Sequence, residues 1–160
     1  MKLSTINEGL GITANIGVVV SIIFLAIELN QANLIAIGDA ERELGYRNIE
    51  ITNTIINNPH LASVVLKLRE RNPDFTEEEN LLAYVWTVQL INLWNASDLA
   101  YKNNQITEDV YEGMMANIRG NLITNPGLAP YLYNGAQGET QPRLVRRIQQ
   151  EVIALGLLEQ

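Results

Sequence analysis

The longest uninterrupted apolar pattern in the chain lies near its N-terminus. The 19 residues between Glu8 and Glu28 carry no charge. As a helix they span roughly 28 Å, which is close to the hydrocarbon thickness of a bilayer. Val18, Ile22 and Leu25 belong to a run that is apolar on every face, whereas a surface helix of a small domain has a polar stripe. The pattern predicts a transmembrane anchor over residues 1–30.

Two alternatives to an anchor exist for this segment. A cleaved signal peptide needs a small-x-small cleavage site after its apolar core, and the sequence Ala26-Ile27-Glu28-Leu29-Asn30 lacks one. The second alternative is a buried core helix of a soluble domain. The charge-free length and the missing cleavage pattern favour the anchor over both.

Small residues recur every four positions in the anchor, at Thr13, Gly17 and Ser21. This spacing allows two helix backbones to approach closely in lipid, so it predicts a packing face for self-association or for a partner's membrane helix. Such residues are also common in membrane helices without a partner. Glu28 lies at the predicted membrane boundary, where it either contacts lipid or a partner or is solvated at the interface.

An amphipathic pattern follows the anchor, and no proline interrupts it before Pro59. We therefore expect one long helix that leaves the membrane and ends near Asn58, which can cap a new helix beginning at Pro59. Its apolar stripe has spacings of three, four and seven residues and consists of Leu34, Ile37, Leu44, Ile51 and Ile55.

Further helices are predicted over about 59–71, 77–103, 108–123 and 141–158. Thr76 and Glu79 form a capping-box pattern before the third helix of the chain, and Thr107 is the expected cap of the fourth. A short helical turn and a loop precede the last helix. No alternating strand pattern occurs in the sequence, so the fold class is all-α, with a bundle of about four helices completing a helical domain over residues 31–160.

Composition narrows the range of functions. The chain has 18 acidic and 11 basic residues, a formal net charge of −7, and such a surface repels phosphate backbones, so we expect no nucleic acid partner. Cysteine is absent and His60 is the only histidine, which removes thiolate nucleophiles and most metal-ligand patterns. Without a Gly-rich phosphate loop either, we expect a protein that is not an enzyme and has no cofactor or bound metal.

Two groups of side chains remain as candidate sites. Trp86, Asn92 and Asn95 lie on the apolar third helix, where polar residues need hydrogen-bond partners, and they indicate either a ligand pocket or ordinary core packing. Arg143 and Arg147 lie one turn apart on the last helix. They are suited to anionic lipid headgroups or an acidic partner, or to a solvated face that pairs with Glu151.

Two blocks of sequence resemble uncharacterised bacterial single-pass membrane proteins. The first is IGVVVSIIFLAIELNQ, residues 16–31, and the second is DLAYKNNQITEDVYEGMMANIRGNLITNPGLAPYL, residues 98–132. In the second block such proteins are usually richer in aromatic residues than this chain. The resemblance implies a membrane-anchored helical domain and brings no activity with it.

These observations predict a non-catalytic structural or accessory subunit, anchored by one helix in the bacterial inner membrane. We expect it to assemble with itself, as a homo-oligomer, or with a larger membrane complex. The alternative is a membrane-tethered sensor whose helical domain binds a small molecule. Lys2 on one side of the anchor nearly balances Arg42 and Arg47 on the other, so the charge pattern assigns no side of the membrane to the helical domain.

Overall fold

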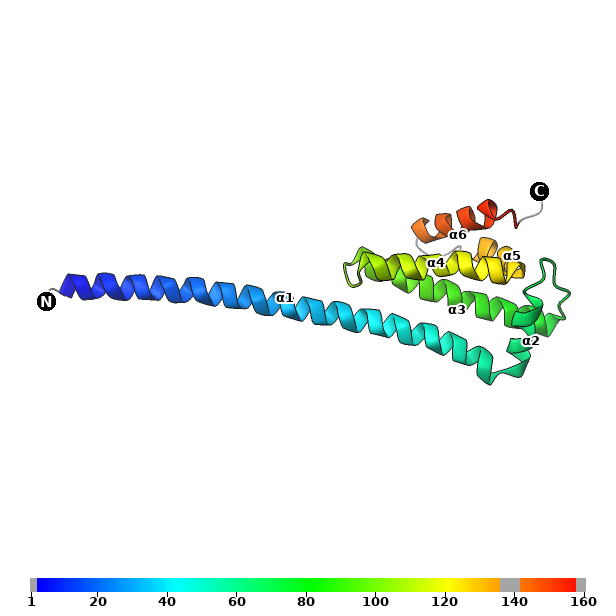
Figure 1. The fold of residues 1–160 in the computed structure, drawn as a ribbon, viewed down its shortest axis with the longest axis horizontal. Coiled ribbons are helices and arrows are strands. Elements are labelled where there is room, and N and C mark those ends of the chain that lie inside the picture. Colours follow the sequence, from blue (N-terminus) through cyan, green and yellow to red (C-terminus); the bar gives the residue numbers. More distant parts are fainter. Residues whose placement is uncertain (1–2, 136–141, 158–160) are drawn as a thin grey trace. The chain divides into compact units, whose positions relative to one another are not determined.

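The computed structural model describes residues 3–135 and 142–157, with side chains from Ala14 onward. Its described residues form helices and no strand, which confirms the all-α class. Figure 1 shows the elements in chain order: α1 (Leu3–Asn57), α2 (Pro59–Lys67), α3 (Glu77–Lys102), α4 (Glu108–Thr124), the 3₁₀ turn η1 (Pro126–Leu128), α5 (Ala129–Gly135) and α6 (Pro142–Ala154).

The chain divides into two compact units, Met1–Gly38 and Asp39–Gln160. The first contains the apolar part of α1, and the second contains the rest of α1 and all later helices. The two units meet between Gly38 and Asp39. The boundary expected from the sequence, at residue 30, is a different one, because it divides a predicted membrane segment from the helical domain. That boundary therefore stays a prediction.

The last turns of α1 belong to the helical domain. Leu44 is buried, and Ile51 and Ile55 pack against the same core, as the apolar stripe predicts. Leu34, the first residue of the predicted stripe, is 60% exposed in the other unit. The helix ends at Asn57, and Asn58 caps α2, because its side-chain oxygen accepts the Leu61 backbone N–H at 3.1 Å.

The centre of the domain is α3, which contacts α2, α4, α5 and α6. Trp94 on α3 is fully buried and packs in one core with buried side chains of α4 and α6. The first turn of α3 has the predicted capping box between Thr76 and Glu79, with both hydrogen bonds present. A helix that is apolar on most faces is surrounded by its neighbours, which is the arrangement the sequence predicts for α3.

One backbone contact joins distant parts of the domain. The Gly127 N–H donates to the Leu68 carbonyl at 2.9 Å, so η1 lies directly against the turn that follows α2. A Cβ atom at position 127 would lie 2.7 Å from the Glu70 carbonyl oxygen and 3.0 Å from that of Leu68. Only glycine allows this close approach of two backbones.

Candidate functional site

The apolar part of α1 exposes its side chains on every side. Phe24 is 64% exposed and Ile22 60%, and the large apolar residues from Ile16 to Ile27 are all at least half exposed. Among the described residues this is the one helix long and apolar enough to cross a membrane, and no residue of its most apolar stretch is buried. A signal sequence or a helix of a soluble protein can meet the same test of length and composition.

Two of the small residues of this segment, Gly17 and Ser21, have described surroundings. A Cβ added to Gly17 would meet nothing within 4 Å. The Ser21 hydroxyl donates to the Gly17 carbonyl at 2.8 Å, so it is satisfied within the helix and needs no partner. The Thr13 side chain lies outside the described side chains. Glu28 is exposed on the same helix.

The three residues of the predicted ligand pocket have different surroundings. Trp86 is only 4% exposed and belongs to the core, although its indole N–H has no hydrogen-bond partner among the described residues. Asn95 is half-buried and takes part in an interaction. Only Asn92 is exposed and lines a hollow of the surface.

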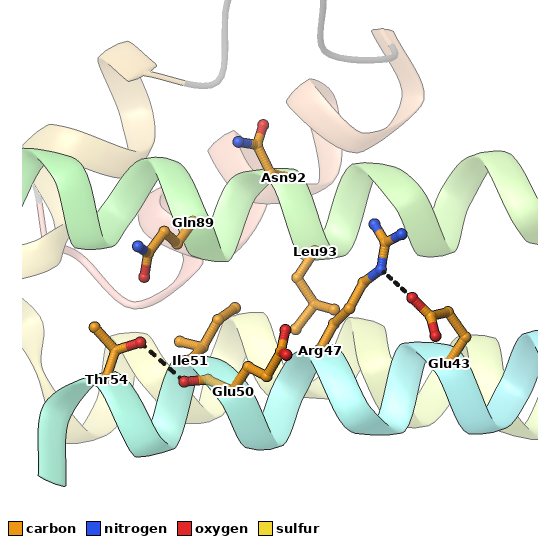
Figure 2. A pocket seen from close by; sticks show the side chains of 8 residues that line it. All are labelled: Glu43, Arg47, Glu50, Ile51, Thr54, Gln89, Asn92 and Leu93. Carbon is orange, nitrogen blue, oxygen red and sulfur yellow. Dashed lines mark hydrogen bonds and ion pairs between the residues drawn. The ribbon is translucent and has the colours of Figure 1, made fainter. Parts of the chain in front are cut away.

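That hollow is a groove between the last turns of α1 and the middle of α3 (Figure 2), with a volume of about 470 Å³. Two of its residues, Arg47 and Glu43, form an ion pair of 3.0 Å. It is lined by Glu43, Arg47, Glu50, Ile51, Thr54, Gln89, Asn92 and Leu93. The α1 side of this groove is not evident from the sequence, because spacing along one helix does not show which other helix it faces.

The groove combines polar walls with an apolar floor. In Figure 2 the Gln89 amide extends from α3 toward α1, the Glu50 carboxylate rises from α1, and Ile51 lies between them. The Gln89 side-chain oxygen is buried and accepts no hydrogen bond from the described residues. The Thr54 hydroxyl donates to the Glu50 backbone carbonyl at 2.9 Å, and the exposed Glu50 carboxylate has no hydrogen bond or ion pair among the described residues.

The two arginines of α6 are paired within the domain. Arg147 forms a two-pronged contact with Glu112 of α4, at 3.2 and 2.8 Å, and Arg143 lies 3.6 Å from the buried carboxylate of Asp98 on α3. The predicted pairing with Glu151 is wrong, because Glu151 instead accepts from Arg119 at 2.9 Å. Long side chains reach across to a neighbouring helix when an opposite charge faces them there.

An aromatic and charged cluster surrounds Asp98, and sequence reasoning missed its composition. The Tyr111 hydroxyl donates to Asp98 at 2.9 Å, and the rings of Tyr111 and Tyr101 stack with centroids 4.3 Å apart. The Arg143 guanidinium lies 4.8 Å from the Tyr111 ring centroid, within cation–π range. Burial, reinforced by the hydrogen bond to Asp98, raises the pKa of Tyr111. With its carboxylate and hydroxyl already paired, the cluster serves to join α3, α4 and α6.

A further contact attaches α1 to the domain. Glu41 accepts the Thr107 backbone N–H at 2.9 Å and the Thr107 hydroxyl at 2.6 Å. Thr107 is the N-cap residue of α4, as predicted, but its side chain makes no cap hydrogen bond. A carboxylate from α1 binds at this helix end instead, where the helix dipole favours negative charge. The Thr107 hydroxyl and then its backbone N–H lower the pKa of Glu41.

Catalytic or metal-binding geometry does not emerge from the described residues. No three His, Cys, Asp or Glu side chains in this part of the chain are placed to hold a metal ion, and His60 is exposed at the start of α2. The chain matches no protein-family model, no curated protein and no solved structure. The resemblance to bacterial membrane proteins thus stays a prediction.

Proposed function

We propose that this protein is a single-pass membrane protein whose helical domain has a structural or accessory role. It is held in the bacterial inner membrane by the apolar part of α1 and assembles there with itself or with a larger membrane complex. The observation that carries the proposal is the exposure of apolar side chains around the whole circumference of this helix, from Ile16 to Ile27. Such a surface is costly in water and is covered at no cost by lipid.

Other observations support a non-catalytic role. Asp98 accepts a hydrogen bond from Tyr111, and Arg147 pairs with Glu112. These contacts join α4 and α6 to the domain, and each of these charged groups already has a partner within it. The bacterial location is supported by the sequence resemblance alone.

The membrane proposal is tested by extraction of the full chain from membranes with alkaline carbonate. We expect the protein to stay in the pellet with its N-terminal segment intact by mass spectrometry. Release of the intact chain into the supernatant would contradict the anchor, and a shortened chain lacking the apolar segment would identify a signal peptide.

A pair of variants makes this test specific. Replacing both Val18 and Ile22 with arginine places two charges near the centre of the apolar segment, at a cost of about 5–7 kcal/mol for insertion, so we expect loss from the pellet. The control replaces Asn30 and Asn33 with arginine, beyond the predicted boundary, and should stay in the pellet because the long side chains reach the interface.

A further inference from the structure

The groove between α1 and α3 contains two hydrogen-bond acceptors without a donor among the described residues, one of them buried and the other exposed. The buried side-chain oxygen of Gln89 has no donor, and the Glu50 carboxylate takes part in none of the ion pairs or hydrogen bonds of the described residues. Buried polar atoms are nearly always hydrogen-bonded in folded proteins. The buried Gln89 oxygen therefore needs a donor from outside the described chain, which is either water or a ligand, whereas the Glu50 carboxylate is exposed and hydrated until a cation replaces that water.

The charged residues that line the groove favour a ligand with a positive charge. Arg47 is the only basic side chain of the lining, and Glu43 already neutralises it. Glu50 then leaves the groove with one uncompensated negative charge, and a cation that donates N–H groups meets both this charge and the Gln89 oxygen. A charge-assisted hydrogen bond of this kind is roughly twice as strong as a neutral one.

The size and apolar lining of the groove indicate what part of the ligand lies between its charged groups. Its volume of about 470 Å³ lies within the range of small-molecule sites. Ile51 and Leu93 supply apolar surface between the polar residues. A short chain of methylene groups can cover these two side chains while amino groups at its ends reach the acceptors.

We propose that this groove binds a small alkylammonium compound, such as a linear diamine, through Glu50 and Gln89. The inference goes beyond the anchoring role and does not depend on it, because all the lining residues lie in the unit Asp39–Gln160. It takes up the sensor alternative with a different set of residues, of which only Asn92 is shared with the predicted pocket.

The test uses the full chain in a non-ionic detergent and 1,4-diaminobutane as the probe, titrated to about 10 mM to cover weak specific binding. Binding is followed by calorimetry and by the NMR signal of the Gln89 side-chain amide. We expect a saturable shift of that amide. Glu50→Gln should weaken binding about tenfold, the effect of losing one charge-assisted hydrogen bond, and Gln89→Leu should weaken it several-fold.

Matched controls separate this site from general attraction to an acidic protein. Glu70→Gln removes the same charge from an exposed position outside the groove and should leave the affinity unchanged. Equal weakening by Glu70→Gln and Glu50→Gln, or the same Gln89 shift with magnesium chloride, would overturn the proposal. So would equal binding of the uncharged 1,4-butanediol, or no shift at all from a groove that holds water only. Unchanged backbone spectra of each variant show that it is folded.

Discussion

At the scale of single residues, Gly127 has the tightest surroundings of the described glycines. A methyl group there meets two backbone carbonyl oxygens, at 2.7 and 3.0 Å, and backbone cannot move aside as a flexible side chain can. We expect Gly127→Ala to lower the free energy of unfolding by about 1–3 kcal/mol, the usual cost of overpacking. Denaturant unfolding of the full chain in detergent, followed by tryptophan fluorescence, measures it.

Gly120 provides the matched control for this residue. It lies inside α4, and an added Cβ would meet nothing within 4 Å. Gly120→Ala should therefore stabilise the protein by roughly 0.5–1 kcal/mol, because alanine loses less backbone entropy in a helix. If Gly127→Ala also stabilised the protein, the close contact of η1 with the turn after α2 would be refuted.

Also at the residue scale, Glu41 makes the stability of the domain depend on pH. Hydrogen bonds from Thr107 lower the pKa of Glu41 from 4.5, so the folded state binds this proton less readily than the unfolded chain. Its stabilising contribution is therefore complete above pH 4.5 and is lost as the pH falls through the lower, folded-state pKa.

We expect the Thr107 amide signal in NMR spectra to titrate below pH 4.5 and the titration to vanish in Glu41→Gln. The control is Glu70→Gln, which changes an exposed carboxylate without a hydrogen bond in the described chain and should leave the Thr107 titration intact. A Thr107 midpoint at or above pH 4.5 would contradict the contact.

At the scale of elements, α6 is held on the domain by two kinds of contact, and their magnitudes differ. Its apolar face inserts Leu144, Ile148 and Val152 fully into the core, whereas the Arg147 and Glu112 side chains of its ion pair remain 31% and 52% exposed. Ile148→Ala should cost about 2–5 kcal/mol, and Arg147→Gln about 1 kcal/mol or less. Both are measured by denaturant unfolding. A larger cost for Arg147→Gln would show that the ion pairs hold α6.

The elements also show what sequence reasoning can and cannot reach. The C-terminal end of α1 and the starts of α2 and α3 follow from local chemistry at Asn58, Thr76 and Glu79, so they are predictable. The partners of Arg143, Arg147 and Glu41 are not, because each lies on another helix and depends on how the helices pack. The groove is beyond reach for the same reason: Gln89 and Glu50 are 39 positions apart, and no spacing rule relates them.

At the scale of the whole molecule, the remaining question is whether the anchor is also an assembly surface. The structure leaves space beside Gly17 and satisfies Ser21 within its own helix, so a second helix can approach this face closely, and the sequence spacing extends the face to Thr13. Gly17→Ile fills this face with a bulky side chain. We expect it to abolish self-association, or to release the protein from a larger membrane complex if the face binds a partner's helix.

The control is Val19→Ile, which changes side-chain size on another face of the same helix and should leave assembly unchanged. Energy transfer between fluorophore-labelled copies in lipid vesicles reports self-association without selecting for an unknown partner, and gentle-detergent sedimentation reports a larger complex. Because both variants keep the segment apolar, they insert equally well, and a difference between them can arise only from packing within the membrane. Equal assembly of the two variants would leave the anchor in place and remove its packing face.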